Sequence, residues 1–358
     1  MGALAESYGF EVVNDFSGAA GNTTTVGLLG RRPLRADYLD DCDIIIGDVN
    51  FFRGGDPESG VIFDLGFGFA RKKRLYTFTR DRRDMVHKYP FATFGEKGEL
   101  IDPLGFNYLE AFTVGNLMYV VPSKLVEGTF EDCLKTVVMD LIEDSKDKGQ
   151  RVIPKQDRRD VVTWSPQGTH RAYLAGFECF MRNAVETGEQ MKALCKKYHF
   201  EGIFPPDTAP GVPELGAPGA GPPDDELKKD RYAFAANIFD RDQQHIRNSN
   251  MIIANLNPFH GQESDSGTVF ELGMCYGLGY DCYGFIGDGR PLIERIPCVK
   301  GADGLYRDIE GYLVEDRGFP LNQVIMDGAK IIIGDFEAAA RFAAIDIGVC
   351  SAGSGGVT

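Results

Sequence analysis

The sequence lacks the features of several large protein classes. None of its apolar runs approaches the ~18 residues that a membrane span needs. Basic residues are the minority, with 38 Lys and Arg against 53 Asp and Glu, and a net charge of -15 argues against nucleic acid or an anionic membrane as partner. The start of the chain has no signal-peptide pattern and misses a myristoylation signal. We therefore expect a cytoplasmic protein, with the mitochondrial matrix as the alternative.

Paired cysteines are also absent. The eight cysteines are scattered, form no C-x-x-C motif and are not grouped with the five histidines. Such a pattern is typical of reduced, mostly buried thiols in a reducing compartment, and it argues against a disulfide framework or a zinc site. We expect no metal at these residues.

What the sequence does contain is an internal repeat. Tyr38–Gly66 aligns with His245–Gly273 without a gap, and ten of the 29 positions are identical. Downstream the register slips by one residue, so that Asn116 matches Asn322. The 358 residues also fit about two domains. We interpret the chain as a tandem duplication.

Each repeat alternates short β-branched runs with helical patterns, which predicts two parallel α/β sheets with right-handed crossovers. We expect a first unit at 1–150, a polar linker at 151–170 and a second unit at 171–358. A Pro/Gly-rich insert at 208–224 is either a lid near the site or a tolerated surface insertion. The first unit begins at the equivalent of the second strand, so it is degenerate or the start of the chain is missing.

Four side chains of the second unit are expected where the strands end, at the edge that binds ligands in open α/β sheets. Tyr173 lies in the first strand, Asp207 follows the second, and Asp265 precedes a helix that carries Glu271. Two carboxylates on one rim can divide the roles of nucleophile and acid. Taken singly, however, Asp265 is typical of a turn or cap, Glu271 of a helix-dipole partner, and Tyr173 of a core residue.

The order of these motifs is more specific than any one of them. The segments "YLAGF", "FPPD", "NSNMIIANLNPF" and "ESDSGTVFELG" strongly resemble the nucleoside 2-deoxyribosyltransferase family over about 171–327, and more weakly over 8–120. The resemblance implies a flavodoxin-like sandwich with a five-stranded parallel sheet. It also implies exchange of the base of a 2'-deoxynucleoside through a covalent deoxyribosyl-enzyme, a reaction for which we expect no metal and no cofactor.

The resemblance also assigns roles to residues. By resemblance, Glu271 is the nucleophile, Tyr173 orients it, and Asp265 and Asp242 bind and protonate the base. Members of the family take an Asn from a neighbouring subunit to hold the 5'-hydroxyl, and Asn322 matches that position. The residues expected to contact substrate are Asp207, Gly176, Gly267, Asn322 and Asn116. Because the repeats would form an internal pseudo-dimer, Asn116 should point into the Glu271 pocket.

The first unit departs from the family pattern. Asp64 stands in place of the nucleophilic Glu, Glu58 in place of Asp265, and Arg35 in place of Asp242. A misplacement of about 1 Å can cost ~10²-fold in rate, so we expect this unit to be catalytically inactive. In the second unit, His260 stands where many family members have Arg. The segment "GFECF" stands where the family more usually has a segment that starts with Gly-Pro.

Several functions fit these observations. The leading hypothesis is a deoxyribosyltransferase, or a related nucleoside hydrolase, whose partners are a deoxynucleoside and a free base. The second is a non-catalytic family member that serves as an accessory subunit of a larger complex, and the third is a nucleotide sensor without turnover. The degenerate half and the altered flanks favour the second; the intact motif around Glu271 favours the first.

Overall fold

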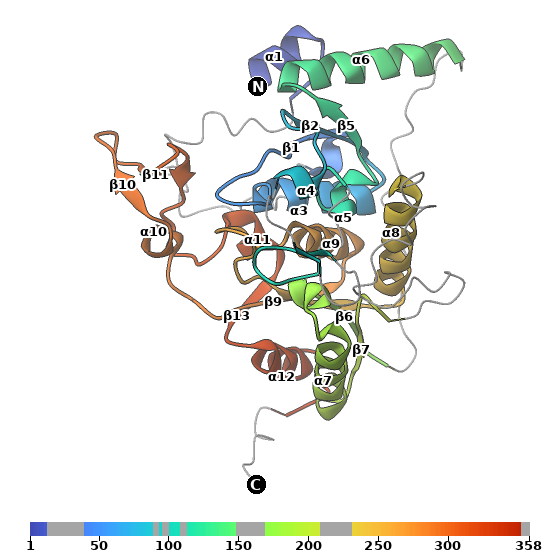
Figure 1. Ribbon diagram of the computed structural model, residues 1–358, viewed down its shortest axis with the longest axis vertical. Helices are drawn as coiled ribbons and strands as arrows, with labels where there is room; N and C mark the ends of the chain where they lie inside the picture. Colours follow the sequence, from blue (N-terminus) through green and yellow to red (C-terminus); the bar gives the residue numbers. More distant parts are fainter. Residues whose placement is uncertain are drawn as a thin grey trace.

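The computed structural model describes residues 1–12, 39–88, 93–94, 100–107, 113–147, 169–207 and 231–351. Within these ranges the chain forms two α/β units that meet through helices (Figure 1). None of the helices in this part of the chain has the length and apolarity to cross a membrane.

The first unit is built around a three-stranded parallel sheet of order β1-β2-β5. Its elements are α1 (Gly2–Ser7), β1 (Ile44–Asp48), α3 (Ser59–Ala70), β2 (Arg74–Thr79), α4 (Met85–Lys88), β3 (Thr93–Phe94), β4 (Leu100–Ile101), α5 (Leu117–Val120), β5 (Lys124–Glu127) and α6 (Phe130–Asp147). Helix α6 covers the outer face, where Cys133 and Val137 pack against Tyr76 and Phe78. Thr129 and Asp132 exchange hydrogen bonds at the start of α6, in the manner of a capping box.

The second unit contains a five-stranded sheet in which all neighbours are parallel. Its elements are β6 (Arg171–Ala175), the 3₁₀ helix η4 (Phe177–Phe180), α7 (Ala184–Lys197), β7 (Glu201–Ile203), α8 (Arg231–Arg247), β8 (Met251–Asn255), α9 (Ser266–Leu278), β9 (Asp281–Ile286), α10 (Leu292–Arg295), β10 (Cys298–Lys300), β11 (Tyr306–Asp308), β12 (Leu313–Val314), α11 (Gln323–Gly328), β13 (Lys330–Ile333) and α12 (Phe336–Asp346). The order β13-β9-β8-β6-β7 corresponds to the 2-1-3-4-5 order of flavodoxin-like folds. The predicted fold class is confirmed.

The two sheets differ in the strands that they contain. The strands β1, β2 and β5 match the last three strands of the second unit, β8, β9 and β13. Residues 8–12, where the sequence places the start of a strand, form no strand, and 13–38 lie outside the described residues. Most of the predicted linker (151–168) and the whole Pro/Gly-rich insert also lie outside them. We propose that the units divide within 151–170.

The molecule is layered (Figure 1). From top to bottom of the view come α6, the three-stranded sheet, the helices α3 and α5, the helices α9 and α11, the five-stranded sheet, and finally α7 and α12. The buried apolar side chains of α3, α5, α8, α9 and α11 belong to one continuous core. The two units therefore share a core, as the subunits of an obligate dimer would.

Helices α3 and α9 cross at two glycines that occupy matching positions. A Cβ built on Gly66 would lie 2.0 Å from the carbonyl oxygen of Phe270, and one on Gly273 would lie 2.1 Å from that of Phe63. Gly273 lies 207 positions after Gly66, and Phe270 lies 207 positions after Phe63, so the crossing is symmetric. Only glycine permits this approach, because any side chain would enter the opposite backbone.

The loops before these helices repeat the symmetry. An antiparallel bridge joins Gly54 to Gly261. The Gly55 N–H donates to the carbonyl of His260 at 2.9 Å, and the Gln262 N–H donates to that of Arg53, also at 2.9 Å. Each unit thus completes the backbone hydrogen bonding of the other.

A turn from each unit also reaches across to the other. Arg53 Nε donates to Asp308 Oδ2 at 2.7 Å, and the matching ring nitrogen of His260 lies 2.6 Å from Asp102 Oδ2. Asp102 lies just after β4, and Asp308 ends β11. The Arg53–Asp308 pair holds a turn of the second unit beside the loop before α3. The His260–Asp102 pair holds a turn of the first unit beside the loop before α9.

Candidate active site

The centre of the second unit's site is a buried tyrosine–carboxylate pair. Tyr173 lies in the middle of β6 and is fully buried, and Glu271 lies in the second turn of α9 with only 5% exposure. The Tyr173 hydroxyl donates to Glu271 Oε1 at 2.6 Å. Burial raises the pKa of Glu271 well above its usual range, the charge of Asp242 adds to this, and the Tyr173 hydrogen bond opposes it.

Two aspartates complete the group. Asp242 lies on α8, and burial raises its pKa to about 6, although Arg241 Nε donates to it at 3.2 Å. Asp265 precedes α9, where its Oδ2 accepts from the Thr268 N–H at 2.8 Å and from the Thr268 hydroxyl at 2.6 Å. Burial raises the pKa of Asp265 as well. Asp265 is therefore a helix cap, and its charge also acts on Glu271.

The first unit contributes Asn116 to this region. Asn116 is 3% exposed, and its Oδ1 accepts from the Met118 N–H at 2.9 Å, which caps α5. Its amide nitrogen lies 2.7 Å from the position that a Cβ on Gly267 would occupy. Gly267 is in the first turn of α9, one turn before Glu271. The structure thus brings Asn116 and Gly267 together at the N-terminus of α9.

Asp207 is not part of this group of hydrogen bonds. Its Oδ1 accepts from Lys192 Nζ at 2.7 Å and its Oδ2 from the Phe204 N–H at 3.0 Å, beyond the end of β7. Its role as a substrate contact stays a prediction. Arg35 lies outside the described residues.

Two titratable side chains near the site, Glu178 and Cys179, were not predicted from the sequence. Glu178, in η4, is buried, and its Oε1 accepts from Asn255 Nδ2 at 2.7 Å. Its Oε2 lies 2.0 Å from where a Cβ on Gly176 would be, so the carboxyl group occupies the space beside that glycine. Burial raises the pKa of the Cys179 thiol, and the charges of Asp265 and Glu271 add to it. The unusual segment "GFECF" was the signal for both.

Aromatic rings from both units cover η4. Phe106 of the first unit makes edge contacts with Phe177 at 5.8 Å and with Phe259 at 5.1 Å, and these two rings stack on each other at 5.1 Å. The Asn107 N–H donates to the carbonyl of Phe180 at 2.7 Å. The first unit therefore packs directly on the segment that follows β6.

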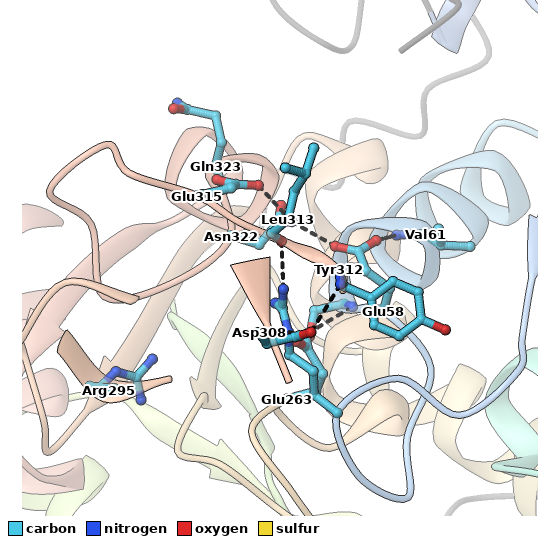
Figure 2. A network of polar contacts seen from close by, with 12 residues as sticks. Glu58, Val61, Glu263, Arg295, Asp308, Tyr312, Leu313, Glu315, Asn322 and Gln323 are labelled. Atoms are coloured by element: carbon cyan, nitrogen blue, oxygen red, sulfur yellow. Dashed lines mark hydrogen bonds and ion pairs between the residues drawn. The ribbon is translucent and has the colours of Figure 1, made fainter. Parts of the chain in front are cut away.

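The equivalent position in the first unit holds a different network (Figure 2). Glu58 caps α3 by accepting from the Val61 N–H at 2.8 Å, as Asp265 caps α9. Asn322 Nδ2 donates to Glu58 Oε1 at 2.6 Å and to Glu315 Oε1 at 3.1 Å. Asn322 thus lies in the first unit's site, as the pseudo-two-fold requires. Asp64, the match of Glu271, is half-buried.

Comparisons with known proteins show the family of the chain. Residues 172–324 match the family model "Nucleoside 2-deoxyribosyltransferase". An uncharacterized protein of Schizosaccharomyces pombe is 31% identical over 181 residues, which span 46% of this chain and 79% of that protein. The chain belongs to the nucleoside 2-deoxyribosyltransferase family.

One solved structure is similar to part of the chain. A 2-desoxiribosyltransferase from Leishmania mexicana is 28% identical and covers 49% of this chain and 97% of its own, with a TM-score of 0.36. At this TM-score the superposition adds nothing to the fold, which rests on the strand order. The family match lies in the unit that carries Tyr173 and Glu271.

Proposed function

We propose that the second unit cleaves the N-glycosidic bond of a 2'-deoxynucleoside and transfers the deoxyribosyl group to another base or to water. The observation that carries the proposal is the hydrogen bond between Tyr173 and Glu271 inside a buried group of acids. A tyrosine hydroxyl beside the carboxylate holds it in one orientation and favours its ionised form, as an attacking carboxylate requires.

In the proposed reaction, Glu271 forms a bond to the anomeric carbon as the bond to the base nitrogen breaks. The electron pair moves to the base, which takes a proton from Asp265 or Asp242. Their raised pKa values support this role, because a carboxyl group that keeps its proton near neutral pH can serve as a general acid. A second base or water then releases the sugar from Glu271.

Proton balance gives the proposed reaction a bell-shaped pH dependence. Glu271 must be ionised to attack, and burial raises its pKa, so the rate should rise with pH as Glu271 loses its proton. The rate should fall again at higher pH, where the acid that protonates the base is lost. No step of this scheme requires a cofactor.

Asn116 is the proposed contact for the sugar's 5'-hydroxyl. It approaches Gly267 from the first unit, while its own unit has Asp64 at the nucleophile position. The proximity supports a division of labour in which one unit supplies the reacting groups and the other completes the pocket.

The experiment is base exchange in the full-length protein. The protein is incubated with deoxyinosine and free adenine, and formation of deoxyadenosine and hypoxanthine is followed. Glu271→Ala should abolish exchange, whereas the matched variant Asp64→Ala should not. Exchange that persists in Glu271→Ala would refute the assignment. Release of free deoxyribose without adenine would identify a hydrolase.

A non-catalytic accessory role is the second candidate, and one observation favours it. The carboxyl group of Glu178 fills the space beside Gly176, a position expected to contact substrate. Under this candidate the wild type shows no exchange. Glu178→Ala, which clears that space, then separates a blocked site from one that has lost its function.

A further inference from the structure

A carboxyl group of the first unit lies at the N-terminus of the second unit's α9. Asp56, in the loop before α3, is 7% exposed. Its Oδ1 accepts from the Ser266 N–H at 3.2 Å and also from the Ser266 hydroxyl. Sequence reasoning gave Asp56 no role, although the repeat has an acid at the matching position, Glu263.

Two carboxyl groups, one from each unit, therefore share one helix terminus. Asp265 accepts from Thr268, and Asp56 accepts from Ser266, two residues earlier. Burial raises the pKa of Asp56 to about 7, and the charge of Asp265 is the second cause. Repulsion between two buried carboxylates is mutual, so the pair loses its protons in coupled steps.

Groups around the pair lower the pKa values of both aspartates, and the pair in turn affects its neighbours. His260, whose ring lies 2.6 Å from Asp102, favours ionisation of both Asp56 and Asp265. The Ser266 and Thr268 donors do the same. The charge of Asp265 also acts on Glu271, Glu178 and Cys179, which surround it in the site. The pair is thus continuous with the reacting groups on one side and with the unit interface on the other.

We infer that Asp56 is a positioning residue of the second unit's site: with Asp265 it forms a carboxyl pair that holds one proton across the interface and supplies it to the departing base. The inference rests on the proposed function. As the bond from Glu271 to the anomeric carbon forms, the base leaves with the electron pair and takes the proton of the pair. Both aspartates are then ionised until the incoming base or water returns a proton in the second half-reaction.

The first unit contains the symmetric counterpart of this pair. The Ser59 hydroxyl and N–H donate to Glu263 Oε2 at 2.6 and 3.1 Å, and Glu58 caps the same helix. Burial and the charge of Glu263 raise the pKa of Glu58 to about 7. This pair has Asp64 instead of a glutamate beside it, so it provides a matched control.

The test compares Asp56→Asn with Glu263→Gln in the base-exchange assay across pH. Asn can still accept from Ser266 but cannot carry the proton, and it removes the repulsion on Asp265. The alkaline limb of the rate should move to lower pH, with a loss of roughly 10-fold or more at neutral pH. Glu263→Gln should keep the wild-type profile. An unchanged limb in Asp56→Asn, or equal shifts in both variants, would overturn the inference.

A second variant guards against misfolding of Asp56→Asn. Ser266→Ala removes the hydroxyl that lowers the pKa of Asp56. The pair should then hold its proton more tightly, and the alkaline limb should move to higher pH, opposite to Asp56→Asn. A shift in the same direction as Asp56→Asn, or none, would contradict a shared proton.

If the wild type neither transfers nor hydrolyses, the proposed function is refuted. The pH dependence of stability then tests separately whether Asp56 and Asp265 share a proton. The unfolding free energy is measured from pH 5 to 8. Groups with a raised folded-state pKa lose their stabilising contribution as pH rises through that pKa. Asp56→Asn should flatten this decline relative to the wild type. An equal slope would show that no proton is shared.

Discussion

The two units keep the same contacts with each other but not the same acids. At the α3–α9 crossing, Gly66 and Gly273 meet the opposite backbone at nearly equal distances. Two residues before each glycine the repeats differ, because Asp64 occupies the position that matches Glu271. The described part of the first unit also has no strand at the place of β6, which supplies Tyr173. Packing at a two-fold interface constrains both copies equally, whereas chemistry needs only one intact site.

The same contrast appears at the loops and caps. Arg53–Asp308 and His260–Asp102 are equivalent side-chain pairs across the units, and Asn116 and Asn322 are equivalent caps within their own units. The two cross-unit pairs hold the units together from both sides. Residues that act on substrate are under no such symmetric constraint, so the first unit can lose them without loosening the interface.

The largest expected effect comes from making the second unit resemble the first. Glu271→Asp shortens the side chain by one methylene and should separate it from both Tyr173 and the anomeric carbon. We expect base exchange to fall by ~10²-fold or more. Asp64→Glu, the reverse change, should create no second site, because its unit lacks a described counterpart of Tyr173. Exchange close to wild type in Glu271→Asp would contradict the comparison.

Substitution of either glycine at the α3–α9 crossing should lower the free energy of unfolding by a similar amount. Gly66→Ala and Gly273→Ala each place a methyl group on the opposite backbone, and overpacking of this kind costs about 1–3 kcal/mol or more. Denaturant unfolding measures the loss. Gly287→Ala is the control, because the nearest atom to its added Cβ lies 3.4 Å away. Unequal losses in the two variants would argue against a true pseudo-two-fold.

The two capping asparagines separate stability from substrate binding. Asn116→Ala should lose about 1 kcal/mol of stability, because Asn116 caps α5. Asn322→Ala should lose a similar amount at α11. Only Asn116→Ala should also raise KM several-fold, since a hydrogen bond to a neutral hydroxyl is worth about 0.5–1.5 kcal/mol. Equal KM values in the two variants would refute the assigned contact.

The smallest effect on base exchange is expected at the first unit's own acid, Glu58. The pKa of Glu58 is raised to about 7 in the folded protein, so its contribution to stability is present at low pH and is lost as pH rises through 7. Glu58→Gln stays neutral and should gain about 2 to 3 kcal/mol on the wild type between pH 5 and pH 8, since one pKa unit corresponds to about 1.4 kcal/mol. Thermal unfolding at the two pH values checks this, and base exchange should not change.

Much of the second unit could be predicted from sequence because its signals are local. Buried β-branched runs mark parallel strands, and the Ser-Gly starts mark α3 and α9. The Tyr173–Glu271 contact followed from the family's motif order. Glu178 and Asp56 could not be assigned in this way. Their environment depends on segments 77 and 210 residues distant in the chain, which the local pattern does not describe.

The sequence by itself determined the duplication, the parallel α/β class and the residues that match the family's reacting groups. These features can be recognised from the order and periodicity of residues along the chain. The tertiary structure alone decided which atoms of the two units meet. Glycine crossings, cross-unit caps and the raised pKa values of Asp56 and Asp265 arise from burial at an interface between distant segments. Burial and the proximity of other charges, not residue type, determine how tightly a carboxyl group holds its proton.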